Sequence, residues 1–229
     1  MEAFLANYKI IVPPNIYIKD PEHTDLGQRI VKYGVELILE IGFDAFTFRK
    51  LGTKIKSNES SIYRYFENKH KFLVYLSSVY WGYMEYEMVL GTYKLNDPID
   101  KLDKYIDIIS KPTTQNNSFS SCDQVQLYQI MINENSKSFL TKEVDSENKD
   151  GYFLVYKRLI QRLCDLIETV APDYQFKQSL SSSLFEASLH QHFLASHFPK
   201  MTSCNNDKNT FLFLKDLVFK TLELHKNDK

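Results

Sequence analysis

One short predicted helix combines hydroxyl, aromatic and basic side chains in a pattern that suits contact with a charged polymer. Ile62 and Phe66 lie one helical turn apart, so both can anchor this helix to a core. Ser60, Ser61 and Arg64 then project in other directions. Hydroxyl groups and the N–H groups at a helix start are common ligands of phosphate, and arginine also reads base edges. These residue types predict a surface that binds nucleic acid.

Positive charge is concentrated around this helix. The chain of 229 residues has a formal net charge of −1, yet residues 45–75 hold seven Lys or Arg and only two Asp or Glu. Such a basic segment suits the phosphate backbone of DNA. Lysines also gather on surfaces simply because they are well solvated, and charge alone leaves that alternative open.

Two further short helices precede this one, each with its own start or stop signal. Thr24 or Asp25 can cap the first helix, and Gly42 ends it because glycine adopts left-handed conformations at little cost. Thr47 can cap the second helix, and Asn58 the third. Two short helices joined by a tight turn can place the second one in the major groove of DNA, which is about 12 Å wide.

At these residues the sequence resembles a known family. The segment GFDAFTFRKLGTKIKSNESSIYRYFENKHKFLVYL is similar to the helix-turn-helix of the tetracycline-repressor (TetR/AcrR) family of bacterial transcription regulators, and the likeness covers about residues 26–75. The shared features are a glycine closing helix one, a threonine opening helix two, an aliphatic-small pair, and a loose Y-x-x-F-x-x-K-x-x-L pattern. Here these are Gly42, Thr47, Leu51-Gly52, Tyr63, Phe66, Lys69 and Phe72-Leu73.

The resemblance implies a role for each polar residue in this region. Ser60, Ser61 and Arg64 would face bases or the adjacent backbone. As alternatives to phosphate contact, Thr47 could serve only as a helix cap, Tyr63 could belong to the core, and Lys69 could simply be solvated. The expected phosphate ligands are Thr47, Tyr63, Tyr65 and Lys69.

The turn between the second and third helices departs from the family pattern. Gly52 stands where alanine is usual, Lys56 where glycine is usual, and Ser57 where valine is usual. Glycine in a helix costs about 1 kcal/mol relative to alanine. A lysine with positive φ is uncommon and strained. We therefore expect this turn to differ in shape from that of other family members.

Composition and periodicity predict an all-α protein of about nine helices, because Gly and Pro number only seven each and long amphipathic segments follow one another. The expected organisation is an extended N-terminal arm (1–22), a helix-turn-helix domain (23–75) and a helical regulatory domain (76–229). Three roles are open for the arm: to cover the helix-turn-helix, to reach the minor groove, or to pack on a partner subunit.

The resemblance implies that the regulatory domain binds a small molecule and dimerises. Its many aromatic residues could line a cavity for an apolar or aromatic effector, although an ordinary aromatic core is the alternative. Trp81, Tyr128 and Tyr156 are the candidate effector ligands. The last two helices are the expected homodimer surface, and two-fold symmetry would then require a palindromic operator.

Other chemistry finds little support in the sequence. Cys122, Cys164 and Cys204 are far apart and form no metal-ligand spacing. The histidines at 190, 192 and 197 have no cysteine or carboxylate at a useful helical step, so we expect no metal site there. We find no nucleophile elbow, phosphate loop or paired carboxylates, so we expect no enzyme, no metal and no cofactor. The leading interpretation is a cytoplasmic, ligand-responsive repressor. The alternative is a small-molecule-binding or protein-interaction module that has lost specific DNA binding.

Overall fold

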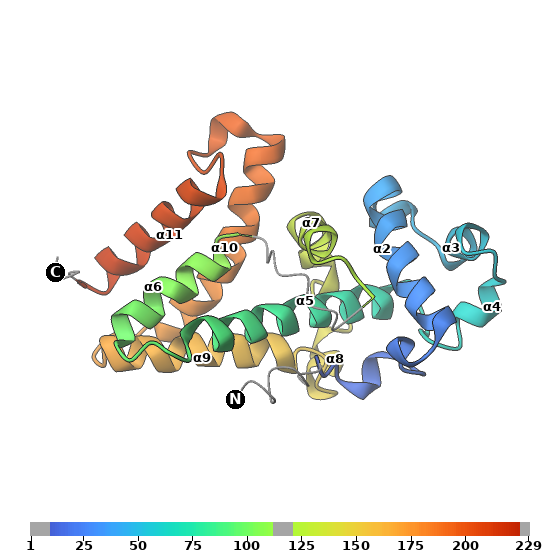
Figure 1. Cartoon of the computed structure of the whole chain (residues 1–229), viewed down its shortest axis with the longest axis horizontal. Coiled ribbons are helices and arrows are strands. Elements are labelled where there is room, and N and C mark those ends of the chain that lie inside the picture. Colours follow the sequence, from blue (N-terminus) through green and yellow to red (C-terminus); the bar gives the residue numbers. More distant parts are fainter. Residues whose placement is uncertain (1–9, 112–120, 225–229) are drawn as a thin grey trace. The chain divides into compact units, whose positions relative to one another are not determined.

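The computed structural model describes residues 10–111 and 121–224, and every regular element in these ranges is a helix (Figure 1). The expected polar loop at 111–121 lies almost wholly outside the described residues. Short 3₁₀ helices are η1 (Pro14–Ile16), η2 (Pro21–His23), η3 (Asn135–Ser138) and η4 (Pro199–Met201). The α-helices are α2 (Asp25–Ala45), α3 (Phe48–Lys54), α4 (Glu59–Ile62), α5 (Lys69–Thr92), α6 (Pro98–Ile109), α7 (Gln124–Glu134), α8 (Val144–Lys149), α9 (Leu154–Val170), α10 (Lys177–His197) and α11 (Asp207–Thr221).

The predicted all-α class is confirmed for the described residues, and α2, α3 and α4 begin at Thr24, Thr47 and Asn58 as expected. The side chain of Thr24 accepts a hydrogen bond from the Gly27 N–H at 3.1 Å, and Asp97 caps α6 in the same way. Asn68 accepts from the Lys71 N–H at the start of α5. In the described residues, no helix is long and apolar enough to span a bilayer.

The amphipathic pattern of the sequence predicts one helix over 149–171, and this prediction is wrong at its start. Gly151 has φ of 84° and separates α8 from α9, which begins only at Leu154. The Tyr152 N–H turns back to the Glu147 carbonyl at 3.0 Å and closes the end of α8. A left-handed glycine of this kind is a common helix stop, so periodicity alone placed the boundary too early.

The chain divides into two compact units. The first contains the described residues up to Tyr83 and those from 121 to Val155, and the second contains Met84 to 111 and Tyr156 to 224. The boundary that we expect near residue 75 for the DNA-binding domain remains a prediction, because it concerns function rather than compactness.

A phenylalanine cluster fills the core of the first unit. Phe46, Phe66 and Phe72 are fully buried, and the Phe72 ring lies 5.6 Å from that of Phe46 and 5.0 Å from that of Phe66. Ile62 is also fully buried, so the expected anchoring of α4 through Ile62 and Phe66 is confirmed. The helix-turn-helix is therefore fixed by aromatic packing against the start of α5.

The second unit contains a buried ion pair between α5 and α9. Glu85 has a side-chain exposure of 5% and lies 2.7 Å from the guanidinium of Arg158 and 3.0 Å from that of Arg162. Burial alone would raise the pKa of Glu85, but hydrogen bonds from the two arginines more than offset this and lower it. The carboxylate therefore stays charged and joins the two helices.

The turn between α3 and α4 has the unusual shape that its residues predict. Lys56 has φ of 52°, the left-handed value that glycine normally supplies. The Ser57 N–H donates to the Gly52 carbonyl at 2.9 Å, which draws the turn back onto α3. A Cβ atom at Gly52 would lie 2.8 Å from the Ser57 carbonyl oxygen. Gly52 is thus required by close backbone approach, which helix propensity does not reveal.

We expect Gly52→Ala to lower the free energy of unfolding by about 1–3 kcal/mol, because the added methyl group meets backbone rather than a movable side chain. Alanine has the better helix propensity, so the sign of the change separates packing from propensity. Thr53→Ala, one position later on the exposed side of α3, is the matched control and should change stability little. Urea denaturation measures the free energy of unfolding of both variants. A Gly52→Ala protein more stable than the wild type would contradict the close approach of the Ser57 carbonyl to Gly52.

Candidate nucleic-acid interface

The start of α4 presents a compact set of short polar groups. The Asn58 side chain caps the helix by accepting from the Ser61 N–H at 3.0 Å. The hydroxyls of Ser60 and Ser61 donate to the same oxygen at 2.9 and 2.6 Å. Each hydroxyl keeps its own lone pairs for an incoming donor. Both serines can therefore accept hydrogen bonds from outside without disrupting the cap.

Beyond α4, two larger side chains project into solvent. Tyr63 is 46% exposed, and Arg64 is also exposed. The Tyr63 ring packs edge-on against Phe48, with centroids 5.1 Å apart, so the tyrosine joins the core on one side and meets solvent on the other. The core contact considered for Tyr63 is thus present on one side, and its phosphate contact stays a prediction. Its hydroxyl lies 3.4 Å from Glu59, a long hydrogen bond that a phosphate could replace.

Thr47 is confirmed as the cap of α3. Its hydroxyl oxygen accepts from the Lys50 N–H at 3.2 Å, and the residue is exposed. The cap leaves the hydroxyl proton available to a phosphate oxygen. The Lys50 ammonium donates to the Ala45 carbonyl at 2.8 Å and adds charge to the same helix start.

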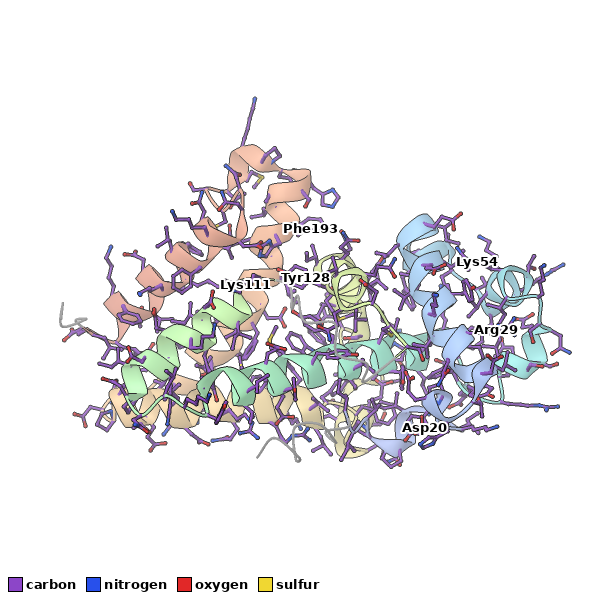
Figure 2. All side chains as sticks on the ribbon, in the orientation of Figure 1. Asp20, Arg29, Lys54, Lys111, Tyr128 and Phe193 are labelled. Carbon is purple, nitrogen blue, oxygen red and sulfur yellow. The ribbon has the colours of Figure 1, made fainter. Side chains whose placement is uncertain are left out.

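The basic residues of the helix-turn-helix fall into two groups. Lys54 lies 2.9 Å from Glu40, and Lys71 lies 2.7 Å from Glu67, so their charges are partly neutralised within the protein. Figure 2 shows Lys54 on α3 beside α2. By contrast, the exposed Arg49, Lys56 and Arg64 form no ion pair with any residue that the structure describes. These three charges, and that of Lys50, remain available to a polyanion.

Tyr65 differs from the other expected contacts because it is buried. Its side chain is 4% exposed, and its hydroxyl lies 2.7 Å from the hydroxyl of Thr24. Little surface is left for a phosphate. The hydrogen bond joins the end of the α4 segment to the start of α2, so the geometry favours a positioning role for this tyrosine.

Lys69 also has protein partners in place of the expected phosphate. Its ammonium donates to the carbonyls of Phe43, Asp44 and Phe46 at 3.1, 3.0 and 3.3 Å. It lies 4.9 Å from the centroid of the Phe43 ring, within the range of a cation–π contact. An ammonium has three N–H donors, and these three bonds use all of them. We name residues 43–46 the α2–α3 junction.

The α2–α3 junction exists because Gly42 interrupts α2. Gly42 has φ of 76° and ψ of 156°, so the predicted helix stop is confirmed, and the helix changes direction there. The next N–H, that of Phe43, donates to the buried carboxylate of Glu134 at 3.1 Å. Glu134 is the last residue of α7 and lies 91 positions away in sequence.

Lys137 completes the contact between the end of α7 and the junction. Its ammonium lies 2.9 Å from Glu134 and 2.8 Å from Asp44. The hydrogen bond from Lys137 lowers the pKa of the Asp44 carboxyl, and the same bond raises the pKa of the lysine. Sequence reasoning missed Glu134 and Lys137, and no local motif marks them.

The three candidate effector ligands lie in different units. Trp81 and Tyr128 are both 4% exposed, and the Tyr80 ring lies 4.7 Å from that of Trp81 and 6.2 Å from that of Tyr128. Tyr156, in the second unit, donates a hydrogen bond to Glu186 at 2.9 Å and packs against Phe185. Tyr80 therefore lies near both Trp81 and Tyr128 in the first unit, and a site that includes all three candidates is not tested.

The histidines of α10 are occupied by ordinary contacts. His192 lies 2.9 Å from the Ser110 carbonyl, and the rings of His190 and His197 pack on Phe193. Across the described ranges, no group of three His, Cys, Asp or Glu residues could hold a metal ion.

A helix-turn-helix whose second helix presents serines, with an exposed arginine directly after it, is the architecture of a DNA-binding regulator. Residues 30–76 match the family model described as "Bacterial regulatory proteins, tetR family". Residues 30–76 therefore form a helix-turn-helix of the tetR family type, and the chain is a DNA-binding transcription regulator.

Solved structures support the fold. AibR in complex with isovaleryl coenzyme A and operator DNA is similar to this chain, with a TM-score of 0.58 and 12% sequence identity over 86% of this chain and 100% of that chain. Apo AibR aligns with a TM-score of 0.48 and 11% identity over 86% of this chain and 99% of that chain. No match was found among curated proteins.

Replacing Lys69 tests whether its ammonium holds backbone or phosphate. We expect Lys69→Met to lower the free energy of unfolding by about 1–2 kcal/mol, because three carbonyls, two of them partly buried, lose a charged donor. Specific DNA binding should weaken, while the slope of log affinity against log salt stays that of the wild type. If the slope instead becomes shallower by about 1 per subunit, Lys69 is a phosphate ligand.

The Asp44–Lys137 pair should make the junction sensitive to acid. Because the folded-state pKa of Asp44 is lowered from 3.8, the pair stabilises the fold above that value and is lost as pH falls through the lower, folded-state pKa. Wild type should therefore melt at a higher temperature than Asp44→Asn at pH 6, and the two should converge near pH 2. A difference in melting temperature that is independent of pH would contradict the ion pair.

Proposed function

We propose that this regulator binds a palindromic operator as a homodimer, and that a small-molecule effector controls this binding. The observation that carries the DNA contact is the exposed polar side of α4. Ser60 and Ser61 lie there on a helix anchored by buried residues, and the exposed Arg64 follows directly after the helix, with uncompensated charges nearby. We assign base or adjacent backbone contacts to these three residues and phosphate contacts to Thr47 and Tyr63.

The proposed dimer surface is formed by α10 and α11. Leu214, Val218 and Leu222 of α11 are buried within the subunit, while Phe213 and Leu217 are 42% and 37% exposed. A helix with a second, exposed apolar side is suited to packing against another copy. Helices from two subunits would form a four-helix interface with two-fold symmetry. Symmetry would then place the two recognition helices about one turn of DNA apart, roughly 34–36 Å.

The effector would act by changing the position of the DNA-contacting helices. AibR was solved with isovaleryl coenzyme A as well as operator DNA, and we take this acyl-CoA as the first probe. Trp81 and Tyr128 remain proposed ligands, with Tyr156 as a separate candidate. A displacement of α7 would reach α3 through Glu134, Lys137 and the α2–α3 junction. The effector must bind the two positions with different affinities for this to occur.

We propose regulation in the cytoplasm, with no catalytic activity, because no catalytic constellation accompanies the helix-turn-helix. The second candidate is an interaction module that retains the fold but no longer reads bases. The left-handed Lys56 and the turn that is drawn back onto Gly52 favour it, because both change the geometry from which α4 projects.

Selection of the purified protein against a random double-stranded DNA pool, at two salt concentrations, separates the two candidates. Enrichment of a palindrome supports a dimeric regulator that reads sequence. Binding that enriches no sequence and disappears as salt rises supports the second candidate, a protein that binds phosphates without reading bases.

Arg64→Ala should weaken binding to the enriched site by about 1–3 kcal/mol and relax its preference at one base position of each half-site. Stability should change little, because the side chain is exposed. Fluorescence anisotropy with the site and single-base variants measures the effect. An equal loss on all sequences would make Arg64 a phosphate ligand, and an unchanged affinity would remove it from the interface.

A further inference from the structure

The segment before α2 is packed firmly on the helix-turn-helix unit. Ile16 has no exposed surface, and Val12 is 8% exposed. The Tyr17 ring packs edge-on against Tyr75, with centroids 6.2 Å apart. Glu22 accepts hydrogen bonds from the hydroxyl of Tyr75 and from Ser121. Residues 10–23 therefore have a defined position. From here on, the name N-terminal arm refers to these described residues.

The arm is joined to the end of the α4 segment. The Ile18 N–H donates to the Tyr65 carbonyl at 2.8 Å. The Lys19 ammonium lies 5.3 Å from the centroid of the Tyr65 ring, within the range of a cation–π contact. Because Tyr65 directly follows the exposed Arg64, the arm places a second positive charge next to the residues proposed to contact DNA.

Among the described residues, no carboxylate forms an ion pair with Lys19. Its side chain is exposed. The neighbouring carboxylate, Asp20, accepts from the Glu22 N–H at 2.9 Å and lies 3.2 Å from His23 (Figure 2). Asp20 is therefore engaged with η2 and does not neutralise Lys19 through a direct contact.

We propose that Lys19 binds the sugar–phosphate backbone of DNA, beside the bases that α4 faces, and adds one phosphate contact per subunit. This proposal rests on the proposed DNA binding. A single ammonium held at a fixed place beside a recognition helix is suited to a point contact with phosphate, which carries no sequence information. The buried Tyr65 would thus contribute by supporting Lys19 rather than by touching DNA itself.

The salt dependence of binding tests this proposal. In Lys19→Met, the slope of log affinity against log salt should fall by about 0.9 for each lost contact, or about 2 for a dimer. At 0.15 M salt, the DNA affinity of Lys19→Met should then be roughly 30-fold lower than that of the wild type. Lys19→Arg should keep the wild-type slope. Lys32→Met, which removes another exposed lysine from the same unit, is the matched control and should bind like the wild type.

Hydroxyl-radical footprinting gives an independent readout, because protection at an outer backbone position should disappear in Lys19→Met only. Equal melting temperatures would show that the variants fold, and Lys19→Gln replaces Lys19→Met if the latter does not. A wild-type slope in the methionine variant, or an equal loss in Lys32→Met, overturns the proposal. If the wild type itself shows no salt-dependent DNA binding, the proposed function fails as well. Failure of the Lys19 contact alone leaves the wild-type binding intact, so the two outcomes can be distinguished.

Discussion

The position of the DNA-contacting helices depends on how the α2–α3 junction is held. Gly42 interrupts α2, and the Phe43 N–H that follows donates a hydrogen bond to the buried carboxylate of Glu134 on α7. The Lys69 ammonium donates to three carbonyls of the same junction, residues 43–46. Donors and acceptors of one short segment are thus satisfied from two different helices. Leaving either set unsatisfied in a buried place would be costly. This constraint fixes the direction in which α3, and with it α4, leaves α2.

The recognition helix could not hold its shape alone. With four residues, α4 is far below the length at which an isolated helix is stable in water. Its conformation comes from the Asn58 cap, from Ile62 in the phenylalanine core, and from the arm that bonds to Tyr65. Such support from several elements gives the exposed serines and arginine a fixed geometry, which base recognition requires.

Local signals made much of this fold predictable. Thr24, Thr47 and Asn58 act as caps because capping depends on neighbours only three positions away, and the spacing of Ile62 and Phe66 marked the anchored side of α4. Lys56 was expected to be strained because it replaces a turn glycine. The partners of Lys69 and Tyr65 could not be predicted, since they lie 23 to 26 and 41 positions away. Glu134 illustrates the same limit, because only tertiary packing brings α7 to Phe43.

The most direct test of this account is a crystal structure of the protein bound to a DNA site selected from a random pool. The account predicts α4 in the major groove, with Ser60, Ser61 or Arg64 at base edges and the Lys69 ammonium still on the carbonyls of the α2–α3 junction. A complex in which α4 lies outside the groove would contradict the assigned DNA interface. A complex in which Lys69 leaves the junction for a phosphate would contradict the constraint on which the position of these helices is argued to depend.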